Sequence, residues 1–256
     1  SVPDHGRYVY RNYEQIASSV GDPELVDELR TLITRWQIDV LFPAHDTVIE
    51  ALAPLTPAEL GGAQLIGSNA LTNLTTRYKS RTYQALSGFD FVPRVFTPQT
   101  VDAADLPVFP KPARGFGAPG VPAAATPHAL DRPQAADPER IAVELLPGPE
   151  FTVDCFTDRH RRLLFVGTRT RDRIRNGISV HSRAVPTNPE VRAIADAIND
   201  TIELRGPWFF QVKQAASGRL KLLEVAPRIA GTMNLYRNRG VNFALLGILD
   251  RLDADV

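Results

Sequence analysis

One stretch near the C-terminus, WFFQVKQAASGRLKLLEVAPRIAG, limits what the rest of the chain can fold into. Two apolar runs, Trp208–Val212 and Leu220–Val225, flank Ala-Ala-Ser-Gly, a pattern typical of a β-hairpin. Because a hairpin holds its two strands side by side, we expect Gln211 and Glu224 to face one pocket. Amide and carboxylate oxygens suit Mg²⁺, which completes its octahedron with phosphate oxygens and water. The alternative is a half-buried hairpin whose polar residues face solvent.

The composition excludes some classes of protein. The 256 residues carry 29 Lys plus Arg and 29 Asp plus Glu. The chain therefore lacks the basic excess that would indicate a nucleic-acid or membrane-surface partner. No apolar run approaches the ~18 residues of a membrane helix, and the start has no signal-peptide pattern. The single cysteine, Cys155, has no partner for an intrachain disulfide, and we expect it in the core. These features favour a cytoplasmic protein.

The N-terminal part has the pattern of an α/β domain. Apolar residues at helical spacing predict a helix over 24–36, and the run over 38–46 predicts a buried strand. A further helix over 47–52 and a short strand over 64–67 follow. His45 and Asp46 would lie at the strand's C-terminal end, where α/β sheets bind ligands. The alternative, which we prefer, is that both are solvated loop residues.

A strand and a glycine-rich loop in the middle of the chain indicate phosphate binding. We expect a helix over 72–86 that carries Lys79, by default on an exposed basic face. Residues 106–112 then predict a strand that ends at Lys111, followed by the loop over 113–121. Backbone N–H groups of such a loop can approach phosphate oxygens, and a lysine adds a point charge. The lysine precedes the glycines, so the Walker spacing is not matched.

Alternating strands and helices fill the rest of the chain. Strands are expected over 141–146, 150–156 and 162–168, and helices over 189–204 and 241–252. The segment RTRDRIRNGISV contains four arginines within seven residues. In a chain of zero net charge, a local phosphate site explains them better than a polyanion groove.

Three motifs in this order resemble the ATP-grasp superfamily: the strand with Lys111 and its glycine loop, the segment VELLPGPEFTVD, and the hairpin with Gln211, Glu224 and Pro-Arg228. The nearest types are the carbamoyl-phosphate-synthetase-like members and the amino-acid ligases, and the similarity runs from about residue 64 to residue 249. The resemblance implies two α+β subdomains that grip ATP, preceded by a partial Rossmann-like domain. The implied domains are residues 1–62, 63–108 and 109–256.

The resemblance also implies a role for each matching residue. Lys79 and Lys111 would hold the α- and β-phosphates, and Glu150 the ribose hydroxyls. Gln211 and Glu224 would bind Mg²⁺ or Mn²⁺, and Arg228 would contact the transferred phosphoryl group. The hinge to adenine would be Glu144, Leu145 and Leu146, the loop over the phosphates would include Gly115, Gly117 and Gly120, and Arg171 and Arg173 would contact phosphate or substrate.

One position departs from the family pattern, in which Asn usually stands two residues after the metal-binding Glu; here it is Ala226. Three functions remain open. The first is an ATP-dependent carboxylate–amine or carboxylate–thiol ligase that acts through an acylphosphate. The second is an ATP-grasp kinase or carbamoyl-phosphate-type enzyme. The third is a nucleotide-binding module without turnover. The implied partners are ATP with small carboxylate and amine substrates, and a homodimer is compatible with the family.

Overall fold

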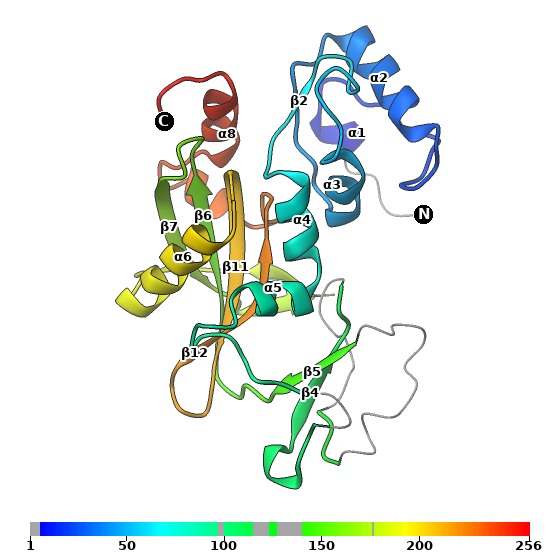
Figure 1. Ribbon diagram of the computed structural model, residues 1–256. Coiled ribbons are helices and arrows are strands. Elements are labelled where there is room, and N and C mark those ends of the chain that lie inside the picture. The colour runs from blue at the N-terminus through cyan, green and yellow to red at the C-terminus, as the bar shows by residue number, and fades with distance from the viewer. Residues whose placement is uncertain (1–5, 97–99, 115–122, 127–139, 176) are drawn as a thin grey trace. The chain divides into compact units, whose positions relative to one another are not determined.

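The computed structural model describes residues 6–96, 100–114, 123–126, 140–175 and 177–256 (Figure 1). The chain divides into two compact units, Ser1–Leu65 and Ile66–Val256. No helix in the described part is both long and apolar enough to cross a membrane. The finer domain limits expected after residues 62 and 108 stay predictions.

The first unit is a small α/β fragment. Its elements are α1 (Gly6–Val9), α2 (Leu25–Trp36), β1 (Val40–Leu41), α3 (Asp46–Leu52) and β2 (Gln64–Leu65). β1 pairs with β2 in parallel, as expected for an α/β part, although the strand predicted over 38–46 is only two residues long. His45 is the N-cap of α3, because its ring nitrogen accepts a hydrogen bond from the Thr47 N–H. The residue therefore has a structural role at the start of this helix.

The second unit holds the remaining elements, which mix helices with antiparallel sheets and confirm the α+β class. They are α4 (Ala70–Arg77), α5 (Lys79–Ala85), β3 (Val95–Phe96), the 3₁₀ turn η1 (Ala103–Asp105), β4 (Val108–Lys111), β5 (Ile141–Glu144), β6 (Glu150–Thr157), β7 (Leu163–Thr170), β8 (Arg173–Arg175), β9 (Ile178–His181), β10 (Ala184–Val185), α6 (Pro189–Thr201), β11 (Gly206–Gln214), β12 (Leu220–Ala226), α7 (Asn234–Arg237) and α8 (Phe243–Arg251).

A five-stranded sheet in the order β10-β7-β6-β11-β12 forms the centre of this unit, and β3-β5-β4 form a second, smaller sheet. Alternation along β11 sends Trp208, Phe210 and Val212 to one face, where they pack with α6 in the largest core cluster. Figure 1 shows α6 lying over this face of the sheet. Phe209, Gln211 and Lys213 therefore take the other face.

This other face has two differently covered ends. At the first, which we call the closed end, Phe209 and Ala226 pack under Tyr236 and Phe243, which come from α7 and α8. At the second, the open end, the sheet presents the polar residues Gln211, Lys213 and Glu224. The C-terminal helices thus cover one half of the face and leave the other half for a site.

The predicted helix over 72–86 is wrong in one respect, because it is two helices. Tyr78, between α4 and α5, has the extended conformation φ −106°, ψ 117°. The N–H of the next residue, Lys79, donates to the carbonyl of Ala113 at 2.9 Å instead of to the preceding turn. The break therefore ties the start of α5 to the chain just after β4.

A β-bulge interrupts the β11–β12 hairpin. Gln211 pairs with Glu224 but Val212 pairs with Leu222, so Leu223 is an extra residue on β12. The Tyr83 hydroxyl donates to the Leu223 carbonyl at 2.8 Å, and the Leu222 N–H donates to the Phe91 carbonyl at 2.7 Å. Because of the extra residue, two consecutive side chains, Leu223 and Glu224, lie on the same face of the sheet.

Candidate functional site

A cavity of about 350 Å³ lies over the open end of the sheet. Its walls come from both sheets of the second unit, from the start of α5 and from the β8–β9 hairpin. Nine of the residues singled out from the sequence line it: Lys79, Lys111, Glu144, Leu145, Leu146, Glu150, Arg171, Gln211 and Glu224. Arg173 and Arg228 are not part of its lining, and Gly115, Gly117 and Gly120 lie outside the described residues.

Gln211 and Glu224 are direct cross-strand partners in the hairpin. Both side chains are half-buried and line the cavity. The pair offers one amide oxygen and one carboxylate, a donor set that fits Mg²⁺ better than a soft metal. Among the described residues, no group of three or more His, Cys, Asp or Glu is arranged to hold a metal ion. Water and substrate oxygens can complete the coordination of an ion held by such a pair.

Two lysines enter the cavity from different elements. Lys79 begins α5 and is only 7% exposed, so the expected exposed basic face does not include it. Lys111 ends β4. Burial lowers the pKa of Lys111 from 10.5 to about 8, with repulsion from Lys79 and a smaller repulsion from Lys213 acting in the same direction; Glu224 and Glu150 partly oppose the shift. The two lysines concentrate positive charge where an anion would bind.

Glu144, Leu145 and Leu146 connect the smaller sheet to the five-stranded one. The Glu144 carboxylate accepts from the Arg94 N–H at 2.9 Å and lies 3.8 Å from the Lys221 ammonium. Further along, the Gly148 N–H donates to the Gln214 carbonyl at 2.9 Å. A Cβ at position 148 would lie 2.7 Å from Cβ of Gln214, so only glycine permits this approach. The hinge is therefore held close against the end of β11.

Glu150, at the start of β6, forms an ion pair with Arg171. Nε of Arg171 lies 2.7 Å from Oε1 of Glu150, and the two side chains are 6% and 22% exposed. Nη2 of Arg171 also donates to the carbonyl of Gly177 at 2.9 Å, in the turn between β8 and β9. Arg171 thus orients the Glu150 carboxylate and ties it to the β8–β9 hairpin.

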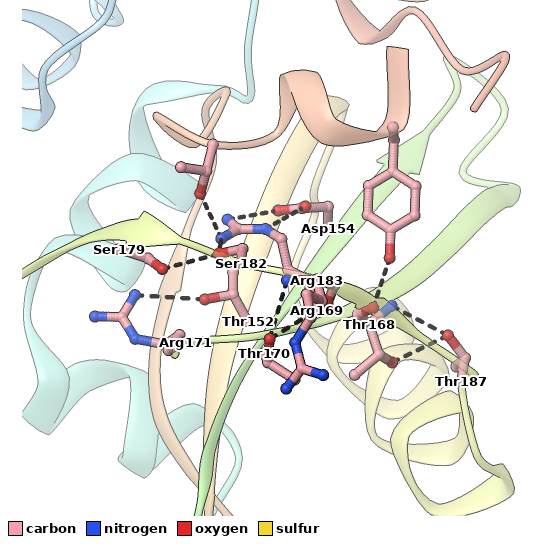
Figure 2. A network of polar contacts seen from close by, with 12 residues as sticks. Thr152, Asp154, Thr168, Arg169, Thr170, Arg171, Ser179, Ser182, Arg183 and Thr187 are labelled. Carbon is pink, nitrogen blue, oxygen red and sulfur yellow. Dashed lines mark hydrogen bonds and ion pairs between the residues drawn. The ribbon is translucent and has the colours of Figure 1, made fainter. Parts of the chain in front are cut away.

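Only part of the arginine-rich segment lines the cavity. Figure 2 shows two of its arginines, Arg169 and Arg171, in a network of polar contacts with Asp154 and Thr152. Arg169 is 2% exposed and pairs with Asp154 through two contacts, Nε–Oδ2 at 2.7 Å and Nη2–Oδ1 at 3.2 Å. Its Nη1 also donates to the hydroxyl of Thr232 at 2.5 Å. Arg173 and Arg175 lie on β8 and are exposed. Of the four arginines, Arg171 alone lines the cavity, and Arg169 is a buried residue paired with Asp154.

Arg228 stands just after β12 and outside the cavity lining. Its guanidinium lies 5.2 Å from the ring centroid of Phe209, and Nη1 donates to the carbonyl of Ile229 at 3.3 Å. Ala226 is 7% exposed and packs in the closed end. It lies on the same face as Glu224, as alternation predicts. At this position the chain offers a methyl group and no oxygen.

Several lining residues were not singled out from the sequence: Phe109, Val143, Ile174, Gly177, Lys213 and Leu223. The position of Lys213 could be predicted, because a residue two places after Gln211 on a strand lies on the same face as Gln211. The position of Leu223 could not, because a bulge is not visible in an apolar run. Cys155 is fully buried in the core cluster, as expected.

Comparison with known proteins agrees with this geometry. Residues 136–256 match a family model described as ATP-grasp in the biosynthetic pathway with Ter operon. No curated protein matches the sequence.

Solved structures resemble nearly the whole chain. The biotin carboxylase domain of 2-oxoglutarate carboxylase from Hydrogenobacter thermophilus, in complex with MgADP, ADP and bicarbonate, has a TM-score of 0.76 at 15% identity over 95% of this chain and 60% of that one. Biotin carboxylase from Campylobacter jejuni, in a β-γ-ATP complex, has a TM-score of 0.75 at 14% identity over 92% and 60%. L-Amino acid ligase from Bacillus licheniformis has a TM-score of 0.61 at 17% identity over 88% and 58%.

The chain thus spans about 60% of the length of these three neighbours. The shared fold, the family match and the order of the motifs around the cavity lead to one conclusion. The chain has the ATP-grasp fold, and its residues 136–256 match an ATP-grasp family model.

Proposed function

We propose that the chain binds ATP in the cavity over the open end and uses it to join a carboxylate to an amine or a thiol. One observation carries the proposal: two lysines, an oxygen-donor pair and a hinge, which come from separate elements, line one cavity. Neighbours of the same fold include complexes with ATP or ADP and an amino acid ligase.

The residues are suited to phosphoryl transfer. Catalysis of that reaction depends on positioning and on positive charge rather than on a protein nucleophile. Lys79 and Lys111 would hold the phosphates, Leu145 and Leu146 would pack beside the base, and Glu150 would bind the ribose. Gln211 and Glu224 would hold Mg²⁺, which neutralises phosphate oxygens when bound.

The proposed reaction has two steps. An oxygen of the substrate carboxylate attacks the γ-phosphorus and ADP leaves, which gives an acylphosphate. The amine or thiol then attacks the acyl carbon, phosphate leaves, and the nucleophile loses a proton. The acylphosphate is hydrolysed by water, so Ile174 and Leu223, two apolar residues of the cavity, would help to keep it dry.

A nucleotide-binding titration followed by an ADP-release assay tests the proposal. ATP with Mg²⁺ should raise the free energy of unfolding, by about 2.7 kcal/mol at a hundredfold excess over Kd. ADP release should then depend on a pool of amino acids, and mass spectrometry should find a product that has lost one water relative to the two substrates.

Two variants sharpen the assay. Glu224→Gln should abolish ADP release, whereas Arg219→Met, which removes an exposed partner of Glu190 at the hairpin tip, should leave it unchanged. A phosphorylated product would indicate a kinase or carbamoyl-phosphate-type enzyme instead, and absence of nucleotide binding would refute the whole proposal.

A second candidate, a nucleotide-binding module without turnover, is favoured by the buried Ala226, which supplies no oxygen beside Glu224. This candidate predicts ATP stabilisation without ADP release from any acid and amine pool. The two readouts above therefore separate it from the ligase.

A further inference from the structure

Lys213 is a charged residue of the cavity to which neither phosphate nor metal binding gives a role. It lies on β11 two residues beyond Gln211 and lines the same cavity. Two strand residues span about 7 Å, so Lys213 is displaced along the strand from the Gln211–Glu224 pair. Its cross-strand partner on β6 is Glu150. Lys213 is therefore beside the proposed ribose carboxylate, at the hinge side of the metal pair.

The backbone next to Lys213 places it at the hinge. Gln214, the following residue, accepts from the Gly148 N–H at 2.9 Å and donates its own N–H to the Pro149 carbonyl at 3.0 Å. These two bonds hold residues 148 and 149, which follow the hinge, against the end of β11. The two proposed phosphate lysines come instead from α5 and β4.

The carboxylates around Lys213 already have partners. Glu150 is paired with Arg171 at 2.7 Å, and Glu144 lies 3.8 Å from Lys221. No ion pair of Lys213 is found within the part of the chain that the structure describes. Apolar lining residues such as Val143, Leu146 and Leu223 share the cavity with it. A half-buried lysine of this kind packs its aliphatic stem on apolar surface and keeps its ammonium available for a ligand.

We propose that Lys213 recognises the nucleoside, and that its ammonium donates a hydrogen bond to an acceptor ring nitrogen of a purine base. The inference rests on the proposed ATP site and adds a base-specificity residue to it. An ammonium can only donate, so Lys213 favours a base edge that carries an acceptor. A purine edge that lacks its ring nitrogen leaves the ammonium without a partner.

A cycle of protein and ligand changes tests this contact. Binding of ATP, 7-deaza-ATP, 3-deaza-ATP and 2′-deoxy-ATP is measured calorimetrically for the parent protein, Lys213→Met and Lys213→Arg. Lys213→Met should lower ATP affinity about tenfold to a hundredfold, the usual range for a hydrogen bond to a charged group. One of the two deaza nucleotides should bind the parent protein about tenfold to a hundredfold more weakly than ATP does. The same nucleotide should bind Lys213→Met at least as tightly as ATP binds that variant. Lys213→Arg, which keeps the charge and the donors, should recover part of the affinity.

Other outcomes overturn the contact. If Lys213→Met weakens the binding of all four nucleotides by the same factor, the lysine contacts the phosphates. If the substitution weakens the binding of every nucleotide except 2′-deoxy-ATP, the lysine contacts the sugar. An unchanged affinity in Lys213→Met, with the parent binding ATP, refutes this inference and leaves the proposed function intact. A parent that binds no ATP refutes both. Arg219→Met controls for loss of a positive charge, and the unfolding midpoint without nucleotide controls for the fold.

Discussion

The two ends of the cavity-bearing sheet face each contain an arginine–carboxylate pair, in very different surroundings. Next to the closed end, Arg169 and Asp154 are 2% and 0% exposed, and Arg169 also reaches Thr232. At the open end, Arg171 and Glu150 are 6% and 22% exposed and line a cavity. The two arginines are separated by one residue, so alternation places both on the same face. Their neighbours differ because they lie at different positions along that face.

Loss of one partner has different consequences for these two ion pairs. A charge buried without its partner costs several kcal/mol, because no water can replace the lost contact. A carboxylate that faces a cavity can exchange its partner for a ligand. We therefore interpret the Arg169–Asp154 pair as a tie between the sheet and the loop at Thr232, and the Arg171–Glu150 pair as part of the binding site.

The largest effect is expected from Asp154→Asn. The variant keeps the shape of the side chain but leaves the Arg169 guanidinium buried without a counter-charge, so the free energy of unfolding should fall by about 3–5 kcal/mol. Urea unfolding measures the change. Replacing both partners, in Asp154→Leu with Arg169→Met, should recover most of the loss. A single variant as stable as the parent would show that the two ends do not differ in the way described.

Glu150→Ala should have its main effect on binding. Loss of the hydrogen bonds that the carboxylate would accept from the ribose hydroxyls should weaken ATP binding by about 1.5–3 kcal/mol, while the urea midpoint falls less than it does for Asp154→Asn. Isothermal calorimetry measures the affinity. Glu190→Ala, which removes the carboxylate of the exposed Arg219 pair, is the matched control and should bind ATP normally. Unchanged affinity in Glu150→Ala would exclude it from the ribose site.

The open end should also respond to pH through Lys111, whose pKa is lowered to about 8. The protonated lysine attracts phosphate, so ATP affinity is full below pH 8 and falls as the pH rises through that value. If bound phosphate raises the pKa well above 9, linkage gives about a tenfold loss between pH 7 and pH 9. Calorimetry at several pH values measures it. Lys111→Arg stays charged over this range and should flatten the profile; an equally steep profile in that variant would assign the dependence to another group.

The smallest effect is expected at Ala226, where the two ends meet. Asparagine here would add an oxygen beside Glu224, so Ala226→Asn should cause a few-fold decrease in the Mg²⁺ concentration needed for half-maximal ATP binding. Titrations of Mg²⁺ at fixed ATP measure the requirement. Ala226→Leu, of similar size but without an oxygen, should not lower it. An Mg²⁺ requirement that is unchanged in Ala226→Asn would contradict this expectation.

Much of the open end could be predicted from the sequence, because its signals are local. The Ala-Ala-Ser-Gly turn fixes the hairpin, and hairpin register then brings Gln211 and Glu224 together. The hinge follows from Pro147 to Pro149, which separate two strands. The same alternation places Lys213 on the face of Gln211, although a lysine on a strand is ordinarily assigned to solvent.

The closed end was harder to predict, because its contacts join distant parts of the chain. Asp154 and Arg169 are 15 residues apart, and nothing in the arginine-rich segment distinguishes the buried arginine from the exposed ones. No proline or glycine marks the break between the two helices at Tyr78. The break depends instead on the hydrogen bond from the Lys79 N–H to the Ala113 carbonyl. Such choices depend on tertiary contacts, which override local propensity.

The bulge at Leu223 also bears on how the protein avoids aggregation. β12 is an edge strand of the five-stranded sheet, and exposed edges are templates on which other chains can add strands. Here Tyr83 and Phe91 occupy the backbone groups of Leu222 and Leu223 that would otherwise accept such an addition. The opposite edge, β10, is only two residues long. The sheet therefore offers little edge for strand addition, and a Tyr83→Phe variant, which keeps the ring but loses the hydroxyl, would free the Leu223 carbonyl on the longer edge without emptying the core.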